Sequence, residues 1–220
     1  MINFIDRGTM PYRDAWALQT ELFDSIVALK RAKRPVENEY VIMVEHTPVY
    51  TMGRHANPMN MLMSPDLLAQ DGIECIPIER GGDITFHGPG QLVVYPIIDM
   101  QLHHLGVKAY VNLLEEAVIR TISSFGIKGE RVEGATGVWI DKDTPRERKI
   151  CAIGVRCSHS VTMHGLALNV STDLAYFNRI NPCGFTDKGV TSITAELGRE
   201  VDINEVKPIM QSILNDFLNQ

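Results

Sequence analysis

The chain has 220 residues, of which 45% are hydrophobic and 22% charged, and its formal net charge at pH 7 is -6. This composition is typical of a globular protein and argues against disorder. The negative charge argues against general nucleic-acid binding, because neutralising phosphates requires a basic surface. A chain of this length can bury about 70% of its unfolded surface around one core. We therefore expect a single catalytic domain spanning residues 1–220.

The N-terminal segment and the cysteines indicate the compartment. Residues 1–6 lack the basic flank and apolar length of a signal peptide, and no apolar run approaches the roughly 18 residues of a membrane helix. Four scattered cysteines are too few for a disulfide framework, and their spacing to nearby histidines matches no standard zinc pattern. We expect a cytoplasmic protein without a metal, a cofactor or a membrane contact.

Helical and strand-like segments follow one another along the chain. Apolar residues at three- and four-residue spacing predict helices at 14–32, 107–125 and 203–218, and Ser64 as an N-cap predicts a short helix at 65–70. Strand-like runs occur at 40–45, 74–77, 92–98, 137–141, 149–156 and 163–170. Consecutive strands without helices between them favour antiparallel pairing. The pattern predicts an α+β fold, with the long helices packed on one face of a mixed, largely antiparallel sheet.

The most distinctive segment is the run RGGDITFHGPGQ at 80–91, which holds four of the 17 glycines. A glycine-rich hairpin is one interpretation of it. However, Arg80, Thr85 and His87 place a cation, a hydroxyl and an imidazole beside glycines that allow a ligand to approach main-chain N–H groups. This combination favours a site for a polar or acylated group. No Gly-Lys-Ser/Thr follows the glycines, so a nucleotide-binding P-loop is not supported.

Cys183 is the candidate nucleophile. The preceding proline fixes the backbone and the following glycine leaves the sulfur uncrowded. A thiol with an ordinary pKa of about 8.5 needs a nearby cation or base to become a thiolate. Lys149, His87 and His164 are candidates for that role, and the residues alone do not decide between a Cys-Lys and a Cys-His pair.

Six blocks of this sequence together resemble the lipoyl(octanoyl)transferase family, also called lipoate-protein ligase B. The blocks are HTPVYTMGR at 46–54, RGGDITFHGPGQ at 80–91, GVW at 137–139, KICAIG at 149–154, HGLALNV at 164–170 and NPCG at 181–184. They occur in the family's order from residue 46 to residue 184, so the resemblance extends over most of the chain. The resemblance implies a fold shared with biotin and lipoate protein ligases, of the class II synthetase type, in which helices flank a mixed sheet.

The resemblance also implies a reaction and its partners. An octanoyl or lipoyl group would move from octanoyl-acyl-carrier protein to a lysine of lipoyl domains, in 2-oxoacid dehydrogenase subunits and the glycine-cleavage H protein. The step would belong to lipoate biosynthesis and need no ATP, since a thioester is exchanged for another thioester and then converted into an amide.

The same resemblance assigns residues. Cys183 would be the acyl-accepting nucleophile, and Lys149 would lower its pKa and shuttle the proton. The residues that would bind the acyl substrate are Arg80, Gly81, Gly82, Asp83, Ile84, Thr85, Phe86, His87, Ala152, Ile153, Gly154, Gly165, Leu166 and Ala167. Since the dyad needs no further base, we expect His87 and His164 to have positioning roles.

Two further expectations concern charge. Main-chain N–H groups of the Gly81-Gly82 turn or of Gly154 are candidates for holding the tetrahedral oxyanion. The implied protein partners are typically acidic, so a basic stretch is the candidate docking face. It comprises Lys142, Arg146, Arg148, Lys149 and Arg156.

Two alternatives to this function stay open. In an ATP-dependent lipoate or biotin protein ligase, Lys149 would contact an acyl-adenylate and Cys183 would be incidental. In a non-catalytic binding module for acyl-carrier protein or lipoyl domains, the pocket would serve recognition alone. ATP dependence of transfer would support the first alternative, and an octanoyl adduct on Cys183 would exclude the second.

Overall fold

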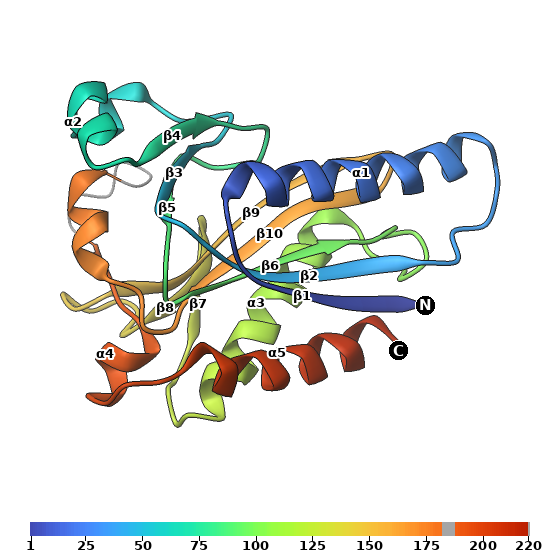
Figure 1. Cartoon of the computed structure of the whole chain (residues 1–220). Helices are drawn as coiled ribbons and strands as arrows, with labels where there is room; N and C mark the ends of the chain where they lie inside the picture. Colours follow the sequence, from blue (N-terminus) through green and yellow to red (C-terminus); the bar gives the residue numbers. More distant parts are fainter. Residues whose placement is uncertain (182–187, 220) are drawn as a thin grey trace.

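The computed structural model describes residues 1–181 and 188–219, and in this part of the chain two sheets form the framework (Figure 1). The large sheet has the order β1-β2-β6-β10-β9-β8-β7, with β11 also paired to β9, and the small sheet has the order β4-β3-β5. The strands are β1 (Ile2–Met10), β2 (Glu39–His46), β3 (Val49–Met52), β4 (Glu74–Pro77), β5 (Ile84–His87), β6 (Gln91–Ile97), β7 (Glu130–Val132), β8 (Ala135–Ile140), β9 (Arg148–Ser158), β10 (Val161–Asn169) and β11 (Gly189–Val190).

Most neighbouring strands of the large sheet are antiparallel, whereas β1 with β2 and β11 with β9 are parallel. This arrangement confirms the predicted α+β fold with a mixed, largely antiparallel sheet. Figure 1 shows that the small sheet lies beyond one end of α1, beside the large sheet.

The helices cover both faces of the large sheet. They are α1 (Tyr12–Arg31), α2 (Pro65–Gln70), α3 (Val107–Ser123), α4 (Ile193–Leu197) and α5 (Ile203–Leu218), with short 3-10 helices η1 (Pro58–Asn60) and η2 (Leu174–Arg179). Helix α1 lies on one face, while α3 and α5 lie on the other (Figure 1). The prediction that the long helices share one face was therefore wrong. An apolar stripe shows that a helix packs on a sheet but carries no information about which face it covers.

The two faces have separate apolar cores because side chains alternate along each strand. In β6, Leu92 and Val94 pack toward α3 and α5, whereas Val93 and Tyr95 pack toward α1. Burial on both sides explains why β6 is apolar at nearly every position rather than alternating. Within the described residues, no helix combines the length and apolar character needed to cross a membrane.

The glycine-rich run is divided among three structures. Residues 81–83 form a loop, Ile84–His87 form β5 of the small sheet, and residues 88–90 form the turn into β6 of the large sheet. The run therefore links two sheets, and it is not a hairpin within one sheet.

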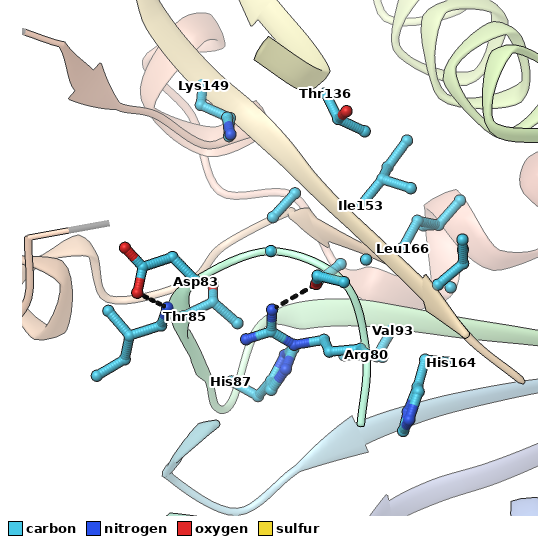
Figure 2. Close-up of a pocket in the computed structure, with 18 of the residues that line it drawn as sticks. Arg80, Asp83, Thr85, His87, Val93, Thr136, Lys149, Ile153, His164 and Leu166 are labelled. Atoms are coloured by element: carbon cyan, nitrogen blue, oxygen red, sulfur yellow. Dashed lines mark hydrogen bonds between the residues drawn. The ribbon is translucent and has the colours of Figure 1, made fainter. Parts of the chain in front are cut away.

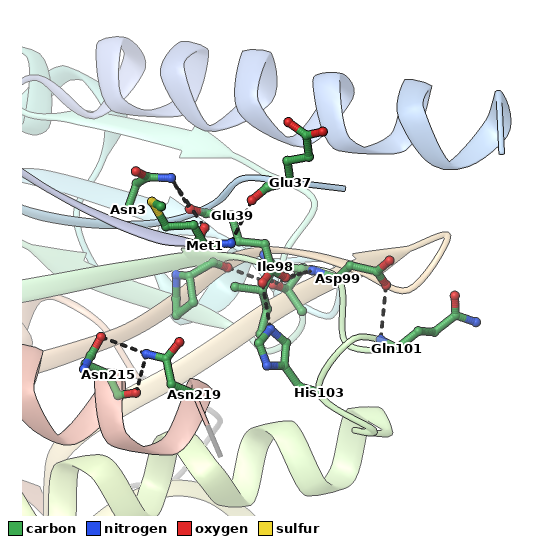
Figure 3. A network of polar contacts seen from close by, with 12 residues as sticks. Met1, Asn3, Glu37, Glu39, Ile98, Asp99, Gln101, His103, Asn215 and Asn219 are labelled. Atoms are coloured by element: carbon green, nitrogen blue, oxygen red, sulfur yellow. Dashed lines mark hydrogen bonds and ion pairs between the residues drawn. The ribbon is translucent and has the colours of Figure 1, made fainter. Parts of the chain in front are cut away.

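A polar network fixes the end of the large sheet near the two termini (Figure 3). The buried carboxylate of Glu39 accepts a hydrogen bond from the Asp99 main-chain N–H (2.7 Å), and its other oxygen lies 2.9 Å from Nε2 of His103. The Met1 ammonium group donates to the Glu37 carbonyl (2.7 Å). These contacts hold the first residues of β1 and β2 in place.

Candidate active site

A cavity of about 490 Å³ lies between the glycine-rich loop, the small sheet and strands β6, β9 and β10 (Figure 2). All of the predicted substrate-binding residues line it except Phe86. The Phe86 ring is buried and instead stacks on Tyr176, with ring centres 4.5 Å apart and an angle of 3° between the planes. Three segments that are far apart in the sequence thus meet around one cavity, while Phe86 supports the small sheet behind it.

Small residues on neighbouring strands let the loop approach the large sheet. Gly154 of β9 lies opposite Gly165 of β10, and Ala152 lies opposite Ala167. A Cβ atom added to Gly154 would lie only 2.9 Å from the Gly81 carbonyl oxygen. The strand thus has no room for a side chain at this point, and the loop rests directly on its backbone.

The buried Arg80 guanidinium shapes this loop. Nη2 donates to the carbonyl oxygen (2.7 Å) and the hydroxyl oxygen (3.0 Å) of Thr51, and Nη1 donates to the Gly81 carbonyl (3.1 Å). The Gly81 main-chain N–H donates to the Val155 carbonyl (3.0 Å). Arg80 therefore connects the loop to the small sheet, and Gly81 connects it to β9.

His87 belongs to a chain of buried hydrogen bonds. The Gln91 amide nitrogen donates to the Phe86 carbonyl (3.1 Å) and to Oδ1 of Asn169 (2.9 Å), which turns the Gln91 oxygen toward Nδ1 of His87 (2.7 Å). Nδ1 must therefore carry the proton, and Nε2 faces the Thr51 hydroxyl at 3.4 Å. Burial holds the pKa of His87 well below its usual range, so the ring is neutral.

The same chain continues to the strand that bears Lys149. The Asn169 amide nitrogen donates to the Thr191 carbonyl (3.0 Å), and the Thr191 main-chain N–H donates to the Lys149 carbonyl (2.9 Å). Val190 of β11 lies opposite Lys149 in the register. Buried polar contacts thus run from Thr51 in the small sheet to the backbone of Lys149.

Lys149 lines the cavity at the end away from His164 (Figure 2). Its ammonium nitrogen lies 4.5 Å from the centre of the Trp139 ring, and the nitrogen of Lys188 lies 5.1 Å from the same centre. Cys183, the predicted partner of Lys149, lies outside the described residues. On the two sides of that segment, the Asn181 N–H donates to the Asn60 carbonyl (2.7 Å) and Lys188 lines the cavity.

The three described cysteines are not activated thiols. Burial raises the pKa of Cys75 and Cys151, and partial burial raises the pKa of the more exposed Cys157. A raised pKa disfavours the thiolate. Cys75 and Cys151 lie in β4 and β9, where they pack as small apolar side chains.

Two further histidines lie near His87. Nδ1 of His46 donates to the Met10 carbonyl (3.0 Å), so its Nε2 accepts from the Tyr95 hydroxyl (2.8 Å). Burial lowers the pKa of His46 to about 4. Burial, with the nearby charge of Arg80, lowers the pKa of His164 to about 3. Both rings are neutral at physiological pH.

The predicted basic docking stretch is largely engaged in ion pairs. The Arg148 guanidinium binds both carboxylate oxygens of Glu196 (2.7 and 2.6 Å) and also Asp141 (2.7 Å). Arg156 pairs with Glu79 at 2.6 Å. The Arg146 side chain, 81% exposed, lies 3.7 Å from Asp141. Opposite charges therefore reduce the positive potential that the sequence indicates.

Several cavity residues escaped the sequence analysis. Tyr12, Tyr95, Phe177 and Lys188 all line the cavity, and the Tyr12 ring stacks on His87 at 5.8 Å. Tyr12 opens helix α1 without any motif around it. Lys188 could have been predicted as a cavity residue, because it lies five residues after the candidate nucleophile Cys183.

The arrangement of sheets and helices is the fold seen in solved lipoate and biotin protein ligases. The bipartite lipoate protein ligase of Thermoplasma acidophilum superimposes with a TM-score of 0.71 at 16% identity, over 99% of this chain and 85% of that one. The biotin protein ligase of Aquifex aeolicus gives a TM-score of 0.51 at 11% identity, over 99% and 68% of the two chains. These similarities confirm the predicted fold.

The chain belongs to the family of lipoyl protein ligase A/B catalytic domains, whose model matches residues 11–215. An octanoyltransferase of Bacteroides thetaiotaomicron is 55% identical over 216 residues, which cover 98% of this chain and 95% of that protein. The predicted family is confirmed.

Proposed function

We propose that the chain carries out octanoyl transfer through a thioester on Cys183, with Lys149 as the proton shuttle. Octanoyl transfer in protein lipoylation is the activity of the chain, as its family and its relatives indicate. The placement of Lys149 carries the proposal for the dyad. Its ammonium group lies at one end of the cavity, and Lys188, which follows the Cys183 segment, lines that cavity too.

In the first step, the Cys183 thiolate attacks the carbonyl carbon of an acyl-carrier thioester. The bond between this carbon and the pantetheine sulfur breaks, and the leaving sulfur takes a proton from the Lys149 ammonium. The Gly81 N–H is engaged by Val155, so we assign the Gly82 N–H as an oxyanion donor.

In the second step, the amine of a lipoyl-domain lysine attacks the enzyme thioester. Neutral Lys149 accepts the proton that the amine loses, the amide forms, and Cys183 leaves as a thiolate. His87 is neutral and held by Gln91, so we give it a positioning role in which it fixes Thr51 and the loop.

The partners are part of the proposal. We propose octanoyl-acyl-carrier protein as the donor, and as acceptors the lipoyl domains of 2-oxoacid dehydrogenase subunits and the glycine-cleavage H protein. A lipoate protein ligase with this fold has been studied together with its lipoyl domain. Within the basic stretch we assign docking to Arg146, since Arg148 is already paired with Glu196.

Free cysteines, including the exposed Cys157, support a cytoplasmic location.

Intact-mass measurement tests the dyad. Incubation with octanoyl-acyl-carrier protein, without ATP, should add one octanoyl group to the wild-type protein and to Cys157→Ala, and none to Cys183→Ala. Transfer to a lipoyl domain should fall about 1000-fold in Cys183→Ala and about 100-fold in Lys149→Met. An ATP requirement, or an adduct that persists in Cys183→Ala, would show that the proposed mechanism is wrong.

A further inference from the structure

The segment GVW at 137–139 lies beside Lys149 but has no part in the proposed mechanism. It belongs to β8, where Trp139 lies opposite Lys149 of β9 in the register. Trp139 is only 1% exposed, and it lines the cavity together with Lys149. The contacts of this segment with Lys149 therefore indicate what it does.

A β-bulge in β9 turns Lys149 toward the cavity. In the register, Val138 lies opposite Cys151. The next residue, Trp139, lies opposite Lys149, so Ile150 is an extra residue of β9. Ile150 and Cys151 both pack in the apolar core under α3 and α5, although the side chains of a regular strand alternate. Without the extra residue, Lys149 would share a face with Cys151 and point into that core.

Gly137 leaves room for the lysine side chain. A Cβ atom built on Gly137 would lie 3.5 Å from Cε of Lys149 and 2.4 Å from the Cys151 carbonyl oxygen. The φ of Gly137 is 122°, a conformation that residues with a side chain rarely adopt. Its main-chain N–H donates to the buried Glu115 carboxylate (3.1 Å). The end of the lysine side chain thus lies against a glycine whose position is fixed.

The Trp139 ring is held in one orientation under the ammonium group. Its Nε1 donates to the Ala135 carbonyl (2.9 Å), and the Lys149 nitrogen lies over the ring, 4.5 Å from the ring centre. A cation at this distance is attracted by the negative face of an indole, most strongly where water is excluded. The attraction favours the charged form of the lysine. Unlike a carboxylate, the ring face holds the charge without accepting strong hydrogen bonds from the N–H groups that the reaction needs.

Charged groups on the surrounding elements also act on Lys149. They lie on the glycine-rich loop, on α3 and near β11 and the start of β9, and they are Arg80, Asp83, Glu115, Glu147 and Lys188. The ammonium nitrogen of Lys188 lies 5.1 Å from the centre of the Trp139 ring, and Lys188 also pairs with Glu147. A test of the ring must therefore leave all of these charges in place.

We propose that Trp139 is a positioning residue for the catalytic amine: its ring holds the Lys149 ammonium group on the cavity side of the sheet and keeps it charged until the leaving sulfur takes the proton. The proposal rests on the proposed function in that Lys149 serves as the proton shuttle. Because the ring acts through Lys149, withdrawing electrons from the indole should lower the pKa of this lysine.

Fluorinated tryptophan tests the ring with little change in its shape. The chain has two tryptophans, Trp16 and Trp139, so Trp16→Phe leaves Trp139 as the one site of incorporation. Fluorine withdraws electrons from the ring face and weakens its attraction for a cation. The pKa of Lys149 would be read by NMR from carbon-13-labelled lysine Cε, with the signal assigned by its loss in Lys149→Met. It should fall stepwise from no fluorine to three fluorines, by about one pH unit in all.

Acylation kinetics test whether the ring matters for the reaction. The pH dependence of kcat/KM would be measured with an octanoyl-pantetheine thioester, since a small donor needs no protein docking. The alkaline limb, where Lys149 loses its proton, should move to lower pH along the fluorinated series together with the pKa. Trp139→Phe keeps an aromatic face and should stay within about fivefold of the wild type, whereas Trp139→Leu should lose about 20-fold.

The reverse arrangement of the label is the control. In Trp139→Phe, fluorinated tryptophan enters only at Trp16, which packs in the core under α1. Fluorination there should change neither the pKa of Lys149 nor the alkaline limb. If Trp139→Leu does not fold, the fluorinated series still decides, because it preserves the ring and its packing.

Two results would overturn the role of Trp139: a pKa of Lys149 that stays constant through the fluorinated series, or an equal shift in the Trp16 control. Failure of the proposed function gives a different result. No octanoyl adduct would then form on Cys183 of the wild type, while the NMR titration would still show whether the ring acts on Lys149.

Discussion

The two faces of the large sheet differ in what accompanies their apolar cores. Under α3 and α5, side chains such as Leu114 and Val118 are fully buried in a continuous apolar core. The face under α1 and the small sheet includes buried histidines. It also includes the close contact of Gly154 with the Gly81 backbone and the positive φ of His164. Both faces thus have an apolar core, but only the face under α1 adds the polar groups and the close backbone contact that shape the cavity. The comparison predicts that changes on the two faces differ in whether they reduce stability or activity, as well as in the size of the effect.

Acidification should expose the difference most strongly, because the neutral histidines lie on the cavity face. The pKa of His46 is about 4 in the folded protein and about 6.5 in an unfolded chain. The unfolded state therefore binds more protons below pH 6.5, and stability that is present above pH 6.5 is lost as the pH falls toward 4. The shift corresponds to about 3 kcal/mol.

Urea unfolding between pH 7.5 and 4 measures this loss. The variant His46→Gln should show a shallower decline than the wild type over the same interval. A free energy of unfolding that stays constant down to pH 4 would contradict the assignment of neutral, buried rings.

Truncation on the apolar face should reduce stability and spare activity. Leu114→Ala removes a fully buried side chain from α3 and should lower the free energy of unfolding by about 3 kcal/mol. Under conditions where the variant stays folded, kcat/KM for octanoyl transfer should change less than about threefold. Leu102→Ala, at an exposed position, serves as the control and should change neither quantity.

A pair of threonine variants gives the smallest but sharpest contrast. Thr51 and Thr121 are both fully buried, and each hydroxyl takes part in a hydrogen bond. Thr51→Val and Thr121→Val should each reduce stability by about 1 kcal/mol. Only Thr51→Val should reduce kcat/KM, by about tenfold, because it removes the hydroxyl that contacts both Nη2 of Arg80 and Nε2 of His87. Equal kinetic effects of the two variants would remove the distinction between the faces.

The parts of the fold that could be predicted from the sequence are those with local signals. The predicted bounds of α5 agree with the structure, since Asp202 and Glu205 form a capping box ahead of a clear apolar stripe. Strand β1 was missed because most of its side chains are exposed or half-buried and it includes Gly8. Which face each helix covers was also beyond reach, because that choice is made by contacts between distant segments.

The candidate site shows the same limit. Three motif segments were expected to meet, and they do meet around the cavity. Tyr12 was not expected there, because it reaches the cavity only through the packing of α1 on the sheet. The absence of a hydrogen-bond partner for the His164 ring among residues 1–181 and 188–219 could not be foreseen either, since it depends on all the surrounding groups.

The close contact between the loop and Gly154 limits how this enzyme could be redesigned. A side chain at that position would collide with the Gly81 backbone, which has no rotamer with which to yield. A bulkier acyl group must therefore be accommodated by smaller side chains elsewhere on the cavity wall, such as at Val93. Most variants with a side chain at residue 154 would be inactive.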